Sequence, residues 1–172
     1  GTPPTPPLMK NAHASTGAFE FSSGEDRIFI NVGPASRSGP YKDLADMTRM
    51  TAAHNALIIA DKNSSRVLPD GKLGSGVTET LTIRETLTNG TRVKLVHDGY
   101  LKRFGVKHER SFSLTDEGKR FSCTERLFGP KIKKLASEAI ALRFHLHPQI
   151  EAMKAPDNRI SLTLRNGKTW IF

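Results

Sequence analysis

Two histidines and an asparagine stand at the ends of predicted strands. His54 precedes an apolar, β-branched run, 56–60, that polar turn residues close, which predicts a buried strand with an imidazole at its start. His13 precedes a second strand in the same way, and Asn31 lies near the end of a third. We therefore expect His13, Asn31 and His54 to converge on one point at the ends of neighbouring strands.

Two other histidine motifs invite a chemical interpretation. His145 and His147 lie on one face of a predicted strand, because side chains alternate with a period of two. Such a pair can ligate metal, but structural or exposed histidines are favoured since the motif offers no third ligand. His97 and Asp98 are adjacent, so in a strand their side chains point to opposite faces. A turn at Asp98-Gly99 is therefore favoured over a catalytic pair.

Several common enzyme classes find no support in the sequence. No Ser/His/Asp triad and no pair of glycosidase carboxylates can be proposed. The glycine-rich stretch from Gly71 to Gly76 lacks the lysine-serine ending of a phosphate loop and does not open a helix.

Composition indicates one globular domain of 172 residues with a net charge of +9. An anionic partner, such as an acidic polysaccharide, nucleic acid or a membrane surface, fits this charge, although many basic domains are simply soluble. The one tight basic cluster, Lys131, Lys133 and Lys134, has no interleaved aromatic residues for base stacking. Cys123 is the single cysteine, so an intramolecular disulfide is excluded. No apolar run approaches the length of a transmembrane helix.

The spacing of short alternating segments predicts an all-β fold. Residues 1–10 are rich in proline and are predicted to form an extended linker, and residues 11–172 form the domain. Asn89-Gly90 indicates a hairpin between two long strands. Roughly ten strands without a long amphipathic helix predict an antiparallel β-sandwich. The predicted strands are 18–22, 27–32, 54–60, 78–87, 91–97, 105–114, 120–127, 138–147, 160–164 and 169–172.

Taken together, these segments resemble the C-terminal domain of the heparinase II/III-like family of polysaccharide lyases. The resemblance covers nearly the whole chain and keeps the order of the family's motifs. It rests on His13-Ala14-x-x-Gly17-x-Phe19-Glu20-Phe21, Ile30-Asn31-Val32-Gly33, Arg49-x-Thr51-Ala52-Ala53-His54-Asn55, His97-Asp98-Gly99-Tyr100-x-x-Arg103-Phe104-Gly105 and Leu142-Arg143-Phe144-His145-Leu146-His147-Pro148. It implies a supersandwich-like β-domain that follows an α/α toroid in the same native chain.

The resemblance also implies a zinc site. The family places histidine, aspartate and histidine at the positions of His13, Asn31 and His54, and these residues bind a zinc ion. A neutral amide is a poor zinc ligand, so we expect zinc to bind weakly or not at all. The alternative is that His13 and His54 are hydrogen-bonded buried histidines whose geometry survives without a metal.

Family enzymes cleave uronate-containing polysaccharides by β-elimination, in which a base removes the proton beside the carboxylate. The toroid supplies the main tyrosine and an Asn or His, so we expect the isolated chain to be inactive. Asn11 stands where competent members have a histidine, and Asn11 and Tyr41 are the catalytic candidates on this chain. Arg49, Tyr100 and Arg103 are the candidates for substrate binding.

Two functions follow from these observations. The first is the domain that closes the cleft of a polysaccharide lyase, and the second is a glycan-binding or scaffold domain that has lost the chemistry. The resemblance is to bacterial-type proteins and leaves periplasm and cytoplasm open.

Overall fold

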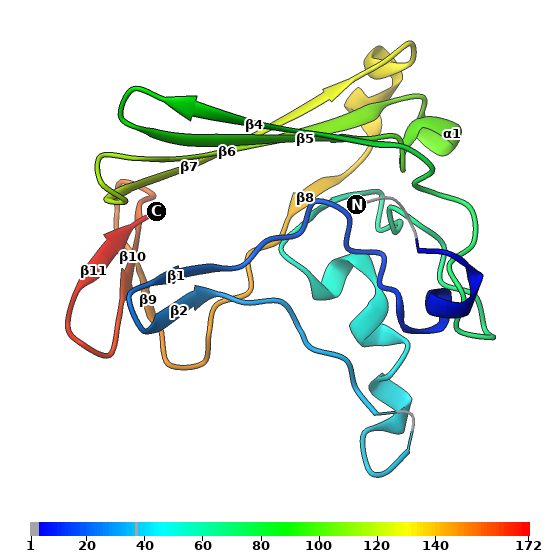
Figure 1. Ribbon diagram of the computed structural model, residues 1–172, viewed down its shortest axis with the longest axis horizontal. Helices are drawn as coiled ribbons and strands as arrows, with labels where there is room; N and C mark the ends of the chain where they lie inside the picture. The colour runs from blue at the N-terminus through cyan, green and yellow to red at the C-terminus, as the bar shows by residue number, and fades with distance from the viewer. Residues whose placement is uncertain (1–3, 37) are drawn as a thin grey trace.

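The computed structural model describes residues 4–36 and 38–172. Strands account for 38% of the residues and helices for 13%. The strands pair in antiparallel sheets, which confirms the predicted all-β sandwich. Figure 1 shows a long sheet that forms one layer and a set of shorter strands that form the other.

The upper layer is a four-stranded meander in which each strand pairs with the next. Long strands with alternating side chains and tight turns build it, as the sequence predicts. A short helix, α1 (Leu101–Phe104), follows the turn at Asp98-Gly99 and ends at Gly105, whose φ of 69° is left-handed. The strands are β4 (Thr80–Leu87), β5 (Gly90–His97), β6 (Lys107–Thr115) and β7 (Arg120–Phe128).

The lower layer is assembled from shorter strands. β1 (Phe21–Ser23) pairs with β2 (Asp26–Phe29), and β3 (Leu57–Ile59) pairs with β8 (Ile140–Leu142). Backbone bonds from Ile30 to His145 and from His147 to Ile28 join β2 to the segment after β8. A three-stranded sheet closes one end of the sandwich (Figure 1): β9 (Glu151–Lys154), β10 (Ile160–Thr163) and β11 (Thr169–Ile171).

Two apolar clusters form the core between the layers. One surrounds the buried Leu57, Ile59 and Tyr100 near α1. The other surrounds Ile28 and Phe29 and reaches the C-terminal sheet. Phenylalanine rings connect the layers through the contacts Phe19–Phe112, Phe19–Phe121 and Phe21–Phe121, with centroids 4.5–5.5 Å apart.

The structure corrects the sequence prediction at several places. Pro6–Asn11 form a 3-10 helix, so the predicted extended linker is wrong for this part, while residues 1–3 lie outside the described residues. The fixed φ of proline suits the first positions of a helical turn, and its missing N–H is not needed there. Further 3-10 helices are Lys42–Leu44, Met47–Arg49, Thr51–Ala53 and Ile132–Ser137.

Strand lengths also differ in the lower layer. The strand predicted from His54 begins only at Leu57, because Thr51–Ala53 wind a 3-10 turn that His54 ends. The strand predicted from 138 to 147 is Ile140–Leu142, and isolated backbone bonds continue the pairing beyond it. β9 and α1 were not predicted.

Candidate functional site

His13 and His54 lie side by side, as the sequence predicts. The Nδ1 atom of His13 is 3.2 Å from the Nε2 atom of His54, a hydrogen-bond distance. Each ring comes from the end of a 3-10 segment, since His13 follows Pro6–Asn11 and His54 ends Thr51–Ala53. His54 is only 4% exposed, and burial, together with the neighbouring rings of His13 and His145, lowers its pKa to about 4. Burial and Arg49 also lower the pKa of His13. Both imidazoles are therefore neutral at pH 7.

Asn31 lies next to this pair but directs its amide elsewhere. Its Oδ1 accepts the backbone N–H of Asn55 at 2.9 Å, and its Nδ2 donates to the carbonyl of Phe19 at 3.1 Å. The amide thus holds the backbone beside His54 and is not free to act as a ligand.

These residues fit the zinc of the family only in part. Two zinc ligands at about 2.0–2.1 Å and a tetrahedral angle are separated by roughly 3.3 Å, which matches the His13–His54 distance. Among the described residues, however, no group of three His, Cys, Asp or Glu side chains could hold a metal ion. The described residues supply two imidazole nitrogens and one amide, and this amide is already hydrogen-bonded to backbone groups. This set is not a complete structural zinc site.

Asn55 is the residue that organises this region, and sequence reasoning missed it. It is fully buried, and its Nδ2 donates to the carbonyls of Phe19 and Ile30 at 2.9 and 3.0 Å. Its Oδ1 accepts the backbone N–H of His145 at 2.5 Å. The side chain therefore joins three chain segments, and a polar residue next to an apolar run was the available signal.

Arg49 serves the same region from inside the domain. It is 4% exposed, and its guanidinium donates to the carbonyls of Met9 and Ala12. The carbonyls that it holds precede His13, so Arg49 fixes the approach of this histidine. Arg49 was predicted to bind substrate, and in the structure its guanidinium is buried against these backbone carbonyls.

The catalytic candidates Asn11 and Tyr41 are both exposed. Asn11 is the last residue of the 3-10 helix that precedes His13. Tyr41 is 68% exposed and precedes the 3-10 helix Lys42–Leu44. This segment projects below the lower layer in Figure 1.

Of the second histidine pair, His145 approaches the site and His147 does not. The His145 ring is within hydrogen-bond distance, 2.9 Å, of the carbonyl of Ala52. His147 accepts the backbone N–H of Gln149 instead. The structure therefore gives His145 and His147 different partners, as expected for structural histidines.

A buried chain of polar groups crosses the inner face of the upper sheet. The backbone N–H of Gly99 donates to His97 Nδ1, whose Nε2 lies 2.9 Å from His108 Nδ1. His108 Nε2 then reaches Glu125 at 2.5 Å, and Arg110 donates to the same carboxylate at 2.6 Å. This pattern requires both rings to be neutral and to donate in one direction toward the carboxylate.

The charges at the end of this chain are compensated. Burial, followed by the interaction with the neighbouring His108 ring, lowers the pKa of His97 to about 3. Burial alone would raise the pKa of Glu125, but the His108 hydrogen bond and the Arg110 charge hold it below its usual value. Arg110, with no exposed surface, also donates to the carbonyls of Gly17 and Asn55. Arg110 therefore links the upper sheet to the segments that carry Gly17 and Asn55.

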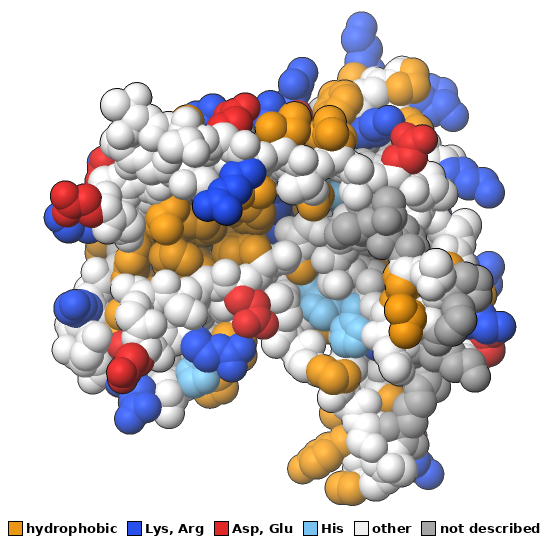
Figure 2. All heavy atoms as spheres, in the orientation of Figure 1, with side chains coloured by type: hydrophobic (Ala, Val, Ile, Leu, Met, Phe, Trp, Pro, Cys, Tyr) orange, Lys and Arg blue, Asp and Glu red, His pale blue; other side chains and the backbone are white. Residues whose placement is uncertain are grey.

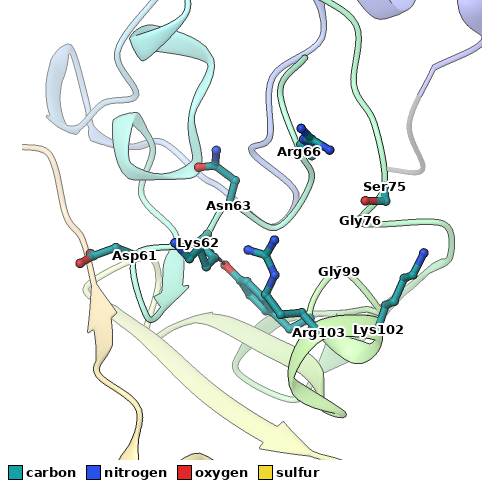
Figure 3. A pocket seen from close by; sticks show the side chains of 10 residues that line it. Asp61, Lys62, Asn63, Arg66, Ser75, Gly76, Gly99, Lys102 and Arg103 are labelled. Atoms are coloured by element: carbon teal, nitrogen blue, oxygen red, sulfur yellow. Dashed lines mark hydrogen bonds between the residues drawn. The ribbon is translucent and has the colours of Figure 1, made fainter. Parts of the chain in front are cut away.

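A basic pocket opens beside α1 (Figure 3). Its volume is about 320 Å³. Tyr100, predicted to bind substrate, lines it but is only 1% exposed, and its hydroxyl donates to the carbonyl of Leu57 at 2.7 Å. Arg103, predicted to bind substrate as well, also lines the pocket and is exposed. The remaining lining residues are Asp61, Lys62, Asn63, Arg66, Ser75, Gly76, Gly99 and Lys102.

No helix of the described residues is long and apolar enough to cross a membrane.

Figure 2 shows histidine side chains at the surface of a hollow on the face drawn there, and apolar side chains in the gap between the two layers.

Comparison with known proteins shows how the chain is related to others. It is 27% identical over 172 residues to FtsZ-localized protein C of Caulobacter vibrioides (strain NA1000 / CB15N), covering 92% of this chain. The chain spans 29% of the length of that relative. No solved structure matches it significantly. The family described as heparinase II/III-like, C-terminal, matches residues 1–172. With paired histidines at the start of a β-sandwich and a family match over its whole length, the chain belongs to the heparinase II/III-like C-terminal domain family.

Proposed function

We propose that this domain closes the cleft of a two-domain protein that binds acidic, uronate-containing polysaccharide. That protein would have the domain arrangement of a polysaccharide lyase. The observation that supports the proposal is the His13–His54 pair, at 3.2 Å, at the positions where the resemblance to the family implies metal-binding histidines. The helical domain of the same native chain, an α/α toroid, would form the other wall and supply the base for β-elimination.

We propose that the base for β-elimination does not come from this end of the domain. β-Elimination needs a group within hydrogen-bond reach of the proton beside the carboxylate. His54 is buried against His13, Arg49 is buried against backbone carbonyls, and Asn11 carries an amide, which does not take up protons at neutral pH. Tyr41 is the remaining exposed candidate on this chain.

An absorbance assay tests this part of the proposal, because β-elimination creates an unsaturated uronate that absorbs in the ultraviolet. The isolated chain should release no such product from heparin, heparan sulfate or alginate. The full-length protein, tested on the same substrates, should release it. Turnover by the isolated chain would contradict the proposal that the helical domain supplies the base. Loss of that turnover in Tyr41→Phe would then identify Tyr41 as the base.

A second candidate is a glycan-binding or scaffold domain without lyase chemistry. Asn11 and Asn31 replace residues that the family uses, and the relative with 27% identity is named for localisation with FtsZ rather than for an enzyme. Full-length protein that binds uronate oligosaccharides but yields no unsaturated product would favour this candidate over the lyase.

We further propose that the His13–His54 pair keeps its geometry without zinc. The hydrogen bond between the rings and the Arg49 contacts would hold it. EDTA should then change the melting temperature by less than about 1 °C, well below the shift for 1 kcal/mol in a domain of this size. Stoichiometric zinc with a large EDTA effect would contradict this, and Asn31→Asp would then be expected to tighten the metal.

A further inference from the structure

We propose that the basic pocket beside α1 is an anion-binding site that takes one carboxylate or sulfate group of an acidic saccharide. Four cationic side chains line this pocket, Lys62, Arg66, Lys102 and Arg103, against one carboxylate, Asp61. Figure 3 shows Arg66, Lys102 and Arg103 around a common opening beside Ser75, while Asp61 points away from them. The choice of a saccharide as ligand rests on the proposed function, whereas the anion site itself does not.

Five arginines elsewhere in the domain each form an ion pair with a carboxylate, namely Arg27, Arg92, Arg110, Arg120 and Arg159. Among the described residues, no ion pair or side-chain hydrogen bond is formed by Lys62, Arg66, Lys102 or Arg103. Four cationic side chains therefore line one cavity against a single carboxylate, Asp61, which points away from the opening in Figure 3, and a bound anion would relieve their repulsion.

The backbone that forms the pocket is held rigidly. A Cβ atom on Gly76 would lie 2.3 Å from Ser65 Cα, and one on Gly99 would lie 2.6 Å from the carbonyl oxygen of Ser64. The Ser65 hydroxyl accepts the backbone N–H of Val77. Backbone bonds between Arg66 and Ser75 and between Gly74 and Arg66 fix the opposite side. A preorganised backbone frame lowers the ordering cost of binding.

The lining favours a carboxylate or sulfate on a hydroxyl-rich molecule. Guanidinium groups donate two parallel hydrogen bonds to such oxyanions, and Asn63 and Ser75 add neutral polar groups. Tyr100 is the one aromatic residue in the lining, and its ring is buried, so no platform for stacking a nucleobase is present there. The lining also lacks exposed apolar side chains that would enter a membrane. The volume is at the lower end of ligand sites, about 300–1,000 Å³, which suits one charged sugar rather than a long polymer segment.

The test titrates this chain with sodium sulfate and separately with a heparin hexasaccharide or an oligogalacturonate, followed by amide chemical shifts and calorimetry. Shifts should cluster at residues 61–66, 75–76 and 99–103. Arg66→Ala and Arg103→Ala should each weaken saccharide binding about tenfold, the loss of one charge-assisted contact. The matched control Lys154→Ala removes one exposed cation from β9 and should change binding less than about twofold. Arg66→Lys and Arg103→Lys keep the charge but lose the two-pronged geometry, so an intermediate loss is expected.

The outcomes separate this proposal from the proposed function. Sulfate binding in the pocket without saccharide binding would support the anion site and overturn the acidic polysaccharide as its ligand. Saccharide binding with shifts elsewhere, unchanged in the Arg66 and Arg103 variants, would overturn the pocket while leaving the polysaccharide partner in place. An equal loss in Lys154→Ala would show attraction by net charge alone and would also overturn the site. Binding of single-stranded nucleic acid in the pocket, tighter than that of the saccharide, would overturn the assigned ligand class.

Discussion

At the residue scale, Asn55 illustrates how one buried side chain can hold a site in place. Its amide reaches the carbonyls of Phe19 and Ile30 and the N–H of His145, and its own backbone N–H is held by Asn31. A buried polar group that loses its partner keeps its desolvation cost, about 1–3 kcal/mol for each group. The loss of folding stability on replacing Asn55 therefore comes from the partner groups left unpaired as much as from the lost amide.

Asn55→Ala should lower the free energy of unfolding by about 3 kcal/mol, because it leaves the carbonyl of Ile30 and the N–H of His145 without the Asn55 partner and removes one of the two donors to the carbonyl of Phe19. Urea denaturation measures the change. Asn89→Ala is the matched control, since the exposed Asn89 amide contacts only Asp116 at a turn, and it should cost less than about 0.5 kcal/mol. Similar losses for both variants would contradict the role given to Asn55.

The buried histidines predict a stability that falls with acid. In the folded domain His54 and His97 have pKa values of about 4 and about 3, against 6.5 as the ordinary value. Between pH 6.5 and 4 the unfolded chain therefore binds more protons than the folded one, so stability is present above pH 6.5 and is lost as the pH falls. The slope should approach about 1.4 kcal/mol per pH unit for each histidine.

Urea midpoints at pH 7.5, 6.5, 5.5 and 4.5 test this expectation. His54→Gln removes one of the two titrating groups, so its stability should fall less steeply with acid than that of the wild type. A wild-type midpoint that stays constant down to pH 4.5 would show that neither ring is held neutral.

The side chains at the site were only partly predictable from sequence. The positions of His13 and His54 at the starts of apolar runs correctly predicted that they meet. The partners of Asn31, Arg49 and Asn55 were not predictable, because they are carbonyls and N–H groups that only the folded chain brings near. Arg110 and Glu125 did carry a signal, since strand alternation placed charged groups on the inner face of the sheet.

At the scale of elements, the hairpin between β4 and β5 depends on a close backbone approach. A Cβ atom on Gly90 would lie 2.1 Å from the carbonyl oxygen of Leu114 on β6. Gly90→Ala should therefore cost more than about 2 kcal/mol, because the backbone of β5 or of the neighbouring strand β6 must move. Gly33→Ala is the control, as nothing lies within 4 Å of its added Cβ. Thermal melts that shift equally for the two variants would contradict this account.

The upper sheet was easier to predict than the lower layer for a physical reason. β4 to β7 are long, alternate regularly and are joined in sequence order, so local signals suffice. The lower layer pairs β3 with β8 across about eighty residues, and its ladders are interrupted by isolated backbone bonds. β9 was missed because all four of its residues are exposed, so it has no alternation of apolar and polar positions.

At the scale of the whole molecule, the two layers are tied together and should unfold as one unit. Trp170, the single tryptophan, packs against Phe21 at the end of the sandwich opposite α1. The buried network of Asn55 and Arg110 connects the layers in between. Unfolding followed by Trp170 fluorescence should therefore coincide with unfolding followed by far-ultraviolet circular dichroism. Separate transitions would show that the C-terminal sheet opens independently.

The contacts of Arg110 have a consequence for the order of events during synthesis and folding. Its guanidinium contacts both Glu125 and the carbonyl of Gly17, which is 93 residues earlier in the chain. The Asn55 side chain accepts the N–H of His145, which is 90 residues later than Asn55. The segments that carry Gly17 and Asn55 therefore leave the ribosome long before Arg110, Glu125 and His145, and loop closure over such distances slows folding. The four-stranded meander can form first from neighbouring hairpins, and the contacts of Asn55 are completed only when the segment that carries His145 arrives.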